Sequence, residues 1–171
     1  MISAVTGEYQ RGGAVQESDI HPFRRWFEDL EIGAETYFGC YEVTRDEVID
    51  FARKYDPQPF HLSDEEAAKT HFGRLAASGW HTCAMTMAVI ARHLVERGQD
   101  GLGSGIDGLR WLKPVYPGDR LTVRGQVIEA RASRSRPGTM IVRTEVRVTN
   151  QADDEVMRYV STVLYSRRPA G

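Results

Sequence analysis

The feature of this sequence that most constrains its fold is a change of hydrophobic period near residue 104. Before that point apolar residues recur at helical spacing, and after it they follow the alternating pattern of strands. The strand-like runs are "GIDGLRWLKPV", "DRLTVRGQVIEARA", "TMIVRTEVRVTN" and "EVMRYVSTVLYSRR", and the turn signals "YPGD", "SRPG" and "NQADD" separate them. Short turns between successive strands predict antiparallel pairing.

The segment before the change of period begins with one more strand. "AETYFGCYEV" (Ala34–Val43) is rich in aromatic and β-branched residues, as strands are. Thr44 and Glu47 then form a capping box, in which the hydroxyl and the carboxylate each satisfy a backbone N–H at a helix start. Pro57 and Pro59 end this helix, because proline cannot continue the helical hydrogen-bond ladder.

A second capping box, Ser63 with Glu66, starts a short helix, and the longest helical signal follows at residues 78–98. Gly98 is its expected C-cap. We expect its apolar face to pack on the sheet, and that face consists of Trp80, Cys83, Ala84, Met87, Ile90, Ala91, Leu94 and Val95. The element order predicts an α+β fold in which an antiparallel five-stranded sheet wraps around one long central helix.

Composition describes an ordinary globular domain and excludes several partners. The chain has 171 residues, 41% hydrophobic and 27% charged, with a net charge of −2, so neither nucleic acid nor an anionic membrane is expected as its main partner. Cys40 and Cys83 lack metal-type spacing and suit a reducing compartment. The N-terminus has no signal-peptide pattern, and no stretch approaches the roughly 20 apolar residues that cross a bilayer, so we expect a cytoplasmic protein.

The loop "YDPQPFH" holds two titratable residues on a stiffened backbone. Asp56 and His61 flank the two prolines, which remove most of the backbone freedom between them. A carboxylate and an imidazole can grip one water, so that one group takes its proton while the other delivers a proton to a substrate. The alternative is scaffolding, in which Asp–Pro starts a turn and His61 caps the next helix.

Gly79 opens the long helix, within "AASGW". Free N–H groups with partial positive charge lie at a helix N-terminus, and they can hold a carbonyl oxygen that gains negative charge, such as that of a thioester. The alternative is that Ser78 is an ordinary N-cap and Gly79 only permits close packing.

With both features in one chain, the sequence resembles the MaoC-like dehydratase family, which includes the (R)-specific enoyl-CoA hydratases. The resemblance rests on "FARKYDPQPFHLSDEEAAKTHFGRLAASG" and, less directly, on "GLRWLKPVYPGDRLTV" and "EARASRSRPG". It covers roughly residues 26–168, which we take as one domain after a flexible tail of residues 1–25. The positions that match the family motif are Asp56, Pro59, His61, Ala67, Phe72, Gly73 and Gly79.

The resemblance implies a hot-dog fold, usually dimeric, and a hydro-lyase. Asp56 and His61 would hold the water that adds across a 2-enoyl thioester, and the Gly79 amide would polarise the thioester carbonyl. The expected partner is a small acyl thioester, namely a CoA ester, and the expected assembly is a homodimer or higher homo-oligomer. A hot-dog acyl-CoA thioesterase and a non-catalytic acyl-thioester-binding subunit remain alternatives.

One departure concerns the acyl pocket. Many family members carry histidine before the helix-opening glycine, where this chain has Ser78. Ser78 and Trp80 are therefore expected to contact the substrate, and Arg74 is expected to meet the phosphates of CoA, together with the hairpin residues Arg131, Arg134 and Arg136.

The remaining histidines are expected to be structural or terminal. His71 is expected at the surface, His93 in the last helical turn, and His21 in the tail, while His81 is left open as a pocket residue. The histidines do not cluster with carboxylates at metal-ligand spacing, so neither a metal nor another cofactor is predicted. Trp111 is expected in the core or at a subunit surface.

Overall fold

The computed structural model describes residues 30–96 and 101–166. The predicted tail of residues 1–25, His21 and the predicted C-cap Gly98 lie outside these ranges. The elements, in chain order, are β1 (Glu35–Glu42), α1 (Arg45–Tyr55), the 3₁₀ helix η3 (Pro59–His61), α2 (Asp64–Ala68), α3 (Gly79–Glu96), β2 (Leu102–Trp111), β3 (Arg120–Ala132), β4 (Thr139–Thr149) and β5 (Glu155–Ser166).

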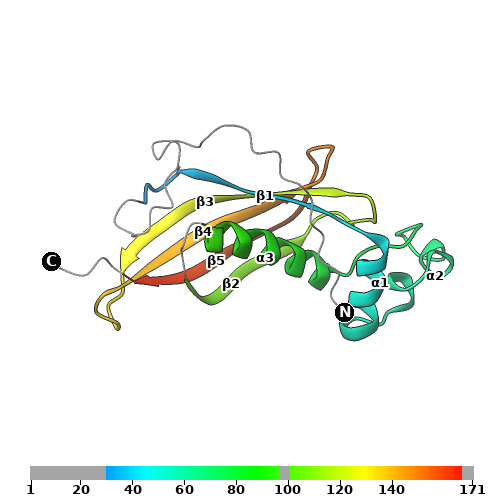
Figure 1. Ribbon diagram of the computed structural model, residues 1–171, viewed down its shortest axis with the longest axis horizontal. Coiled ribbons are helices and arrows are strands. Elements are labelled where there is room, and N and C mark those ends of the chain that lie inside the picture. The colour runs from blue at the N-terminus through cyan, green and yellow to red at the C-terminus, as the bar shows by residue number, and fades with distance from the viewer. Residues whose placement is uncertain (1–29, 97–100, 167–171) are drawn as a thin grey trace.

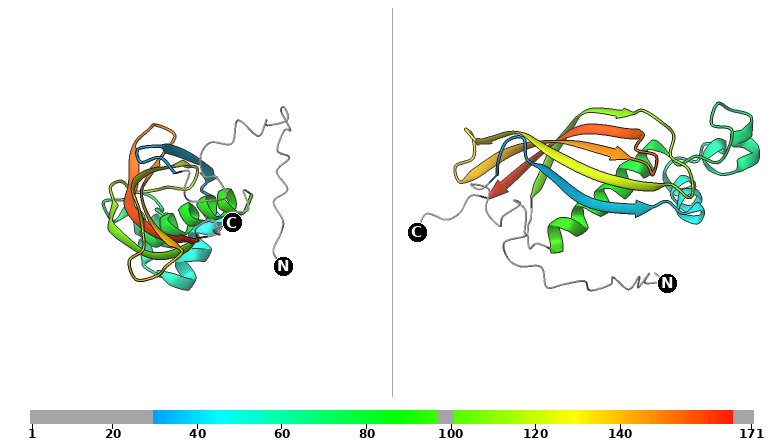
Figure 2. Two further views of the ribbon diagram at one scale, coloured as in Figure 1. Left: turned by 90° about the vertical axis from the view of Figure 1, so that its left-hand side faces the viewer. Right: turned by 90° about the horizontal axis from the view of Figure 1, so that it is seen from above.

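The strands form one antiparallel sheet in the order β1-β3-β4-β5-β2. The sheet curves around α3, which lies along its concave side (Figures 1 and 2). α1 and α2 gather at one end of the sheet, beside the start of α3 (Figure 1). This confirms the predicted fold, a five-stranded antiparallel sheet wrapped around a long helix.

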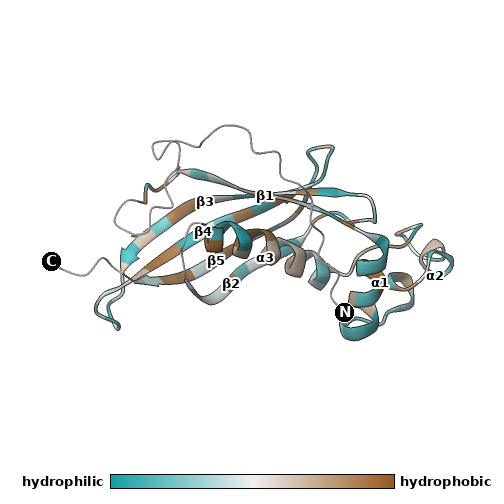
Figure 3. Cartoon of the chain, in the orientation of Figure 1, coloured by the Kyte–Doolittle hydropathy of each residue, from teal (hydrophilic) through white to brown (hydrophobic). Residues whose placement is uncertain are grey.

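The core lies between α3 and the inner face of the sheet. Figure 3 shows the alternation along the strands as bands of brown and teal. In β4 the side chains of Val142, Thr144, Val146 and Val148 are buried, while Arg143, Glu145 and Arg147 lie on the outer face, as the alternation predicts. Large buried side chains such as Leu121 and Met157 contribute about 1.5–3 kcal/mol each through removal from water.

The predicted packing face of α3 is wrong. The buried side chains of α3 are instead His81, Thr82, Met85, Thr86, Val89 and His93. Of the predicted face, Cys83 and Ile90 are half-buried against the core. The large side chains Trp80, Met87 and Val95 are 59%, 51% and 74% exposed. The helix therefore presents its most apolar face outward.

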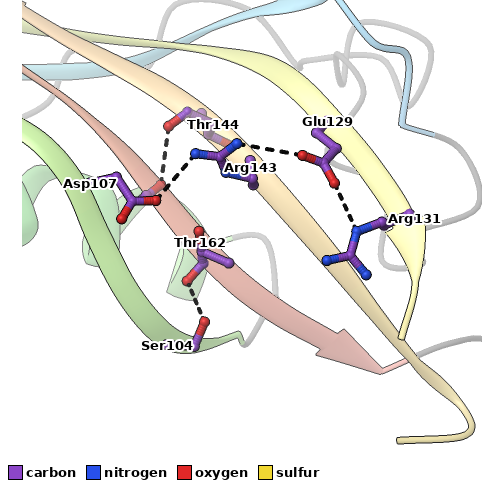
Figure 4. A network of polar contacts seen from close by, with 8 residues as sticks. Ser104, Asp107, Glu129, Arg131, Arg143, Thr144 and Thr162 are labelled. Carbon is purple, nitrogen blue, oxygen red and sulfur yellow. Dashed lines mark hydrogen bonds and ion pairs between the residues drawn. The ribbon is translucent and has the colours of Figure 1, made fainter. Parts of the chain in front are cut away.

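The outer face of the sheet carries a ladder of charged side chains (Figure 4). Arg143 of β4 lies 3.2 Å from Asp107 of β2 and 3.5 Å from Glu129 of β3, and Glu129 accepts a hydrogen bond of 2.8 Å from Arg131. These side chains are partly exposed, so each pair adds at most about 1 kcal/mol to stability. The ladder gives this face the solvated character that its sequence predicts.

The two predicted helix starts at Thr44 and Ser63 are confirmed, and the one at Thr44 differs in detail. Ser63 accepts a hydrogen bond from the Glu66 N–H (3.2 Å) at the start of α2, and Thr44 accepts one from the Glu47 N–H (3.4 Å) at the start of α1. The Glu47 carboxylate does not complete a capping box. It instead accepts hydrogen bonds from the hydroxyls of Thr44 (2.9 Å) and Tyr41 (2.8 Å).

Candidate active site

A cavity of about 570 Å³ opens at the end of the sheet where α1, η3 and the first turn of α3 meet. Its walls are mainly aromatic and aliphatic, and its polar groups are few, as in sites that bind small organic ligands. The lining residues are Asp56, Gln58, Phe60, His61, His71, Phe72, Ala77, Gly79, Trp80, Thr82, Trp111, Leu112, Lys113, Pro114, Val115 and Val156.

The proline loop brings Asp56 and His61 to the wall of this cavity. Asp56 caps the C-terminus of α1, where its N–H still donates to the Ala52 carbonyl (3.0 Å). The chain then turns into η3, which begins at Pro59 and ends at His61. As a result, Asp56 Oδ2 and His61 Nε2 lie 3.5 Å apart.

His61 is held by a backbone carbonyl. Its side chain is buried, and its Nδ1 lies 2.7 Å from the carbonyl oxygen of Ala76. A carbonyl can only accept, so Nδ1 carries the hydrogen of this bond. In the neutral ring Nε2 then has a free lone pair, and this lone pair faces the Asp56 carboxylate.

Asp56 is held by two side-chain donors. The Ser78 hydroxyl donates to Oδ2 (2.7 Å), and the Gln58 amide donates to Oδ1 (2.8 Å). Partial burial raises the pKa of Asp56, but the hydrogen bonds from Ser78 and Gln58 and the charge of His61 together lower it by more. The net result is a pKa below the usual value of this carboxyl. Asp56 is therefore a carboxylate at neutral pH.

Gly79 is the first residue of α3 and lines the cavity. The N–H groups of a helix's first turn have no carbonyl partner within the helix, and the dipole makes this end partly positive. A Cβ on Gly79 would lie only 2.5–2.9 Å from atoms of the Trp111 indole. The glycine therefore permits close packing against Trp111, and the role of its N–H stays a prediction.

The structure places the other predicted contact residues in different environments. Trp80 lines the cavity and packs edge-on against Trp111, with ring centroids 5.3 Å apart. Ser78 is fully buried and is the N-cap of α3, since its hydroxyl also accepts a hydrogen bond from the Trp80 N–H (3.2 Å). Arg74 is not among the lining residues, and its guanidinium lies 4.0 Å above the Tyr116 ring.

The basic hairpin lies away from this cavity. Arg131 is near the end of β3, and residues 134 and 136 are in the β3–β4 turn, at the opposite end of the sheet from α1 and α2 (Figure 1). Because it lies at the other end of the sheet, the hairpin does not contact the cavity of the same chain. A contact of Arg74 or of these arginines with CoA phosphates stays a prediction.

Several residues of the site are not evident from the sequence. Gln58 lies between the two prolines, two residues after Asp56, and this position in the loop is the only sign of its role in the sequence. Trp111 and His71 line the cavity, which the sequence did not predict, and both are also exposed, as expected for a surface His71 and for a Trp111 at a subunit surface. His81, left open above, is not a lining residue: its ring is buried and stacks on Phe51 at 4.6 Å.

Across 30–96 and 101–166, no group of three or more histidine, cysteine, aspartate and glutamate side chains could hold a metal ion. No helix within these ranges is long and apolar enough to pass through a bilayer.

A five-stranded antiparallel sheet wrapped around one long helix, with a cavity at the first turn of that helix, places the protein in the hot-dog fold class. Within this class, residues 29–150 match the family described as "MaoC like domain". The match spans more than half of the chain, and the protein belongs to this family.

Three proteins to which the chain is similar carry dehydratase or hydratase names. The chain is similar to the MaoC-like dehydratase of Rhodospirillum rubrum, with 38% identity and a TM-score of 0.79 over 85% of this chain and 99% of that one. It resembles the R-hydratase PhaJ1 of Pseudomonas aeruginosa, with 27% identity and a TM-score of 0.69 over 85% and 88%. It is 34% identical to the 3-hydroxybutyryl-CoA dehydratase of Methylorubrum extorquens, over 65% of this chain and 69% of that protein.

Proposed function

We propose that this protein is a hydro-lyase that adds water reversibly to a 2-enoyl thioester, forming a 3-hydroxyacyl thioester. The observation that carries the proposal is the pair formed by Asp56 Oδ2 and His61 Nε2, 3.5 Å apart on the wall of a largely apolar cavity. The Gly79 N–H, at the positive end of α3, would receive the thioester oxygen as negative charge grows on it. The acyl chain would occupy the aromatic part of the cavity.

The hydrogen-bond pattern of the pair suits the activation of water. Asp56 Oδ2 and His61 Nε2 both accept, so they do not bond to each other without a proton between them. A water molecule has two O–H groups and can donate one to each. Its oxygen would then bond to C3 of the substrate as an O–H bond breaks and the proton passes to Nε2. The same proton would go to C2, which completes the addition.

Asp56 has a different task from His61 in this scheme. Because its pKa is lowered, Asp56 stays ionised and is a poor proton donor at neutral pH. It would orient the water and stabilise the imidazolium while the proton resides on His61. The names of the relatives support the same chemistry, since one is a 3-hydroxybutyryl-CoA dehydratase and another an R-hydratase.

The test is hydration of crotonyl-CoA and of longer, branched and dicarboxylic enoyl-CoA esters, followed by the loss of enoyl absorbance. We expect Asp56→Asn and His61→Ala each to lower kcat by about 10²–10⁴-fold, the usual contribution of acid–base catalysis. Asp50→Asn is the matched control, because it makes the same change on an exposed part of α1.

Two outcomes would contradict the proposal. One is full turnover of a confirmed enoyl substrate by the Asp56 or His61 variant with an unchanged thermal midpoint. The other is release of free thiol from a saturated acyl-CoA without any hydration, which would identify a thioesterase.

We infer that a second copy of the chain completes the cavity's surroundings. β2 is an edge strand whose residues are almost all exposed, and unpaired edges are available for pairing. Leu102, Ile106, Trp111 and Leu112 of this region are exposed, as are the outward side chains of α3. Trp80 and Trp111 belong both to this apolar surface and to the cavity lining. In a two-fold dimer, this surface would pack against the same surface of the second copy.

Sedimentation of the full chain tests this inference. We expect a particle of two copies, or a multiple of two, at micromolar concentration. A stable monomer with full hydratase activity would contradict it.

A further inference from the structure

Ser78 occupies a position between the start of α3 and the Asp56 carboxylate. Its side chain is 1% exposed, and its Oγ makes two hydrogen bonds. It accepts from the Trp80 N–H at 3.2 Å and donates to Asp56 Oδ2 at 2.7 Å. A hydroxyl has one hydrogen, so this hydrogen is committed to the carboxylate.

This arrangement links the helix end to the carboxylate. The Trp80 N–H belongs to the first turn of α3, where the helix dipole is positive. An oxygen that accepts from such a donor becomes a better donor through its own O–H, because hydrogen bonds in a chain polarise one another. The acceptor here is charged, and hydrogen bonds to charged groups are the stronger ones.

Ser78 also determines which carboxylate oxygen faces His61. Gln58 holds Oδ1 from an exposed position, whereas Ser78 holds Oδ2 from the interior. Oδ2 is the oxygen that lies 3.5 Å from His61 Nε2. Without the Ser78 hydroxyl, the carboxylate would be free to rotate away from this position.

The same buried stretch of chain, Leu75–Ser78, holds both members of the pair. The Ala76 carbonyl accepts from His61, and the Ser78 hydroxyl donates to Asp56. Two backbone hydrogen bonds hold this stretch in place. The Leu75 N–H donates to Asp64 Oδ1 (2.8 Å), and the Ala77 N–H donates to the Val115 carbonyl (2.8 Å). Two residues of one rigid segment therefore set the distance between the acid and the base.

We propose that Ser78 is a positioning residue of the hydration reaction, which holds Asp56 Oδ2 toward His61 and transmits the positive end of α3 to it. The proposal rests on the proposed function and assigns Ser78 no contact with the substrate, in contrast to the expectation from the sequence. Ser78 is absent from the residues that line the cavity, which agrees with this role.

The experiment compares Ser78→Ala with the wild type. We expect kcat to fall about 10–100-fold with KM changed less than about threefold, because the carboxylate that orients the water loses its alignment while the cavity stays intact. The pKa of the Asp56 carboxyl should rise, because it loses a hydrogen bond that favours its ionised form. Thr44→Ala is the matched control, since it also removes an N-cap hydroxyl but lies outside the cavity lining.

A second measurement does not depend on turnover. Carboxyl ¹³C NMR titration of Asp56 should show a higher midpoint in Ser78→Ala than in the wild type. If the wild type hydrates no thioester of the panel but this midpoint still rises, the hydration proposal fails while the Ser78–Asp56 link stands. Should Ser78→Ala not fold, Ser78→Cys provides the same readout, with a weaker donor of similar size and a smaller shift.

Two results would overturn the role of Ser78. One is an Asp56 midpoint that stays at its wild-type position in the Ser78 variants. The other is a rise in KM with kcat unchanged, which would mean that the hydroxyl binds the substrate.

Discussion

The two faces of α3 differ in polarity, and the difference is the reverse of that in an ordinary surface helix, because polar side chains are buried and large apolar ones are exposed. The inward face, toward the sheet and α1, buries His81, Thr82, Thr86 and His93 beside Met85 and Val89, whereas the outward face exposes Trp80, Met87 and Val95. The buried threonines are satisfied within the helix, since Thr86 Oγ1 donates to the Thr82 carbonyl at 2.8 Å. Polar side chains can therefore face a sheet when their partners lie in their own helix, and the apolar outward face indicates a contact beyond this chain.

The largest effect is expected from a charge on the outward face. Met87→Asp should convert the inferred dimer to a monomer, because a carboxylate cannot be buried unpaired in an apolar interface. Hydratase activity should fall with it, since Trp80 and Trp111 line the cavity and belong to the surface of the inferred dimer. Analytical ultracentrifugation and the enoyl assay measure the two effects.

Lys54→Asp is the control for this charge change, because Lys54 is exposed on α1. The variant should keep both the assembly and the activity. If Met87→Asp sediments like the wild type, the outward face is not the subunit contact.

An intermediate effect is expected from the buried face, at His81. Burial lowers the pKa of this imidazole from its usual value, a nearby Glu47 opposes the shift, and its Nδ1 is buried without a hydrogen-bond partner. The folded pKa is thus below the unfolded one of about 6.5. The stabilising contribution is complete above pH 6.5 and is lost as the pH falls below it, because the unfolded chain takes up the proton first.

His81→Phe keeps a ring to stack on Phe51 and removes the titration. Between pH 7.5 and 5.5, the wild type should lose stability relative to this variant by on the order of 1 kcal/mol, as measured by urea unfolding at both pH values. Comparing the two proteins cancels the contributions of other titrating groups. Equal losses in both would show that His81 is not the group responsible.

The smallest effect is expected at Thr86, which is fully buried on the inward face. Thr86→Val should change the free energy of unfolding by no more than about 1 kcal/mol, because valine keeps the shape and the Thr82 carbonyl keeps its helical N–H partner. Thr86→Ala should cost more, since it leaves a cavity. If the valine variant were the less stable of the two, the hydroxyl would be essential to the inward face.

Much of the fold could be predicted because local signals agreed with one another. The alternation in β4, the N-caps Thr44 and Ser63, and the proline stop after α1 each act over a few residues, and each lies where the sequence indicates. The orientation of α3 could not be predicted in this way. Hydrophobicity shows that a face will be buried, but it does not distinguish the chain's own sheet from a second subunit.

The candidate site shows the same division between local and distant information. The loop from Asp56 to His61 is a local pattern, and the structure brings its two side chains together. The Ala76 carbonyl and the Trp111 ring come from segments distant in the sequence, and a backbone carbonyl leaves no mark in the amino-acid code. In the sequence, Ser78 is only a departure from the family motif. Its hydrogen bonds to the Asp56 carboxylate and to the Trp80 N–H are what indicate its role.

The contact between Gly79 and Trp111 bears on how this site can evolve. The indole fills the space that any side chain at position 79 would need. A side chain at position 79 therefore requires either a smaller residue at 111 or a displaced indole. Changes at these two positions are expected to be coupled during evolution.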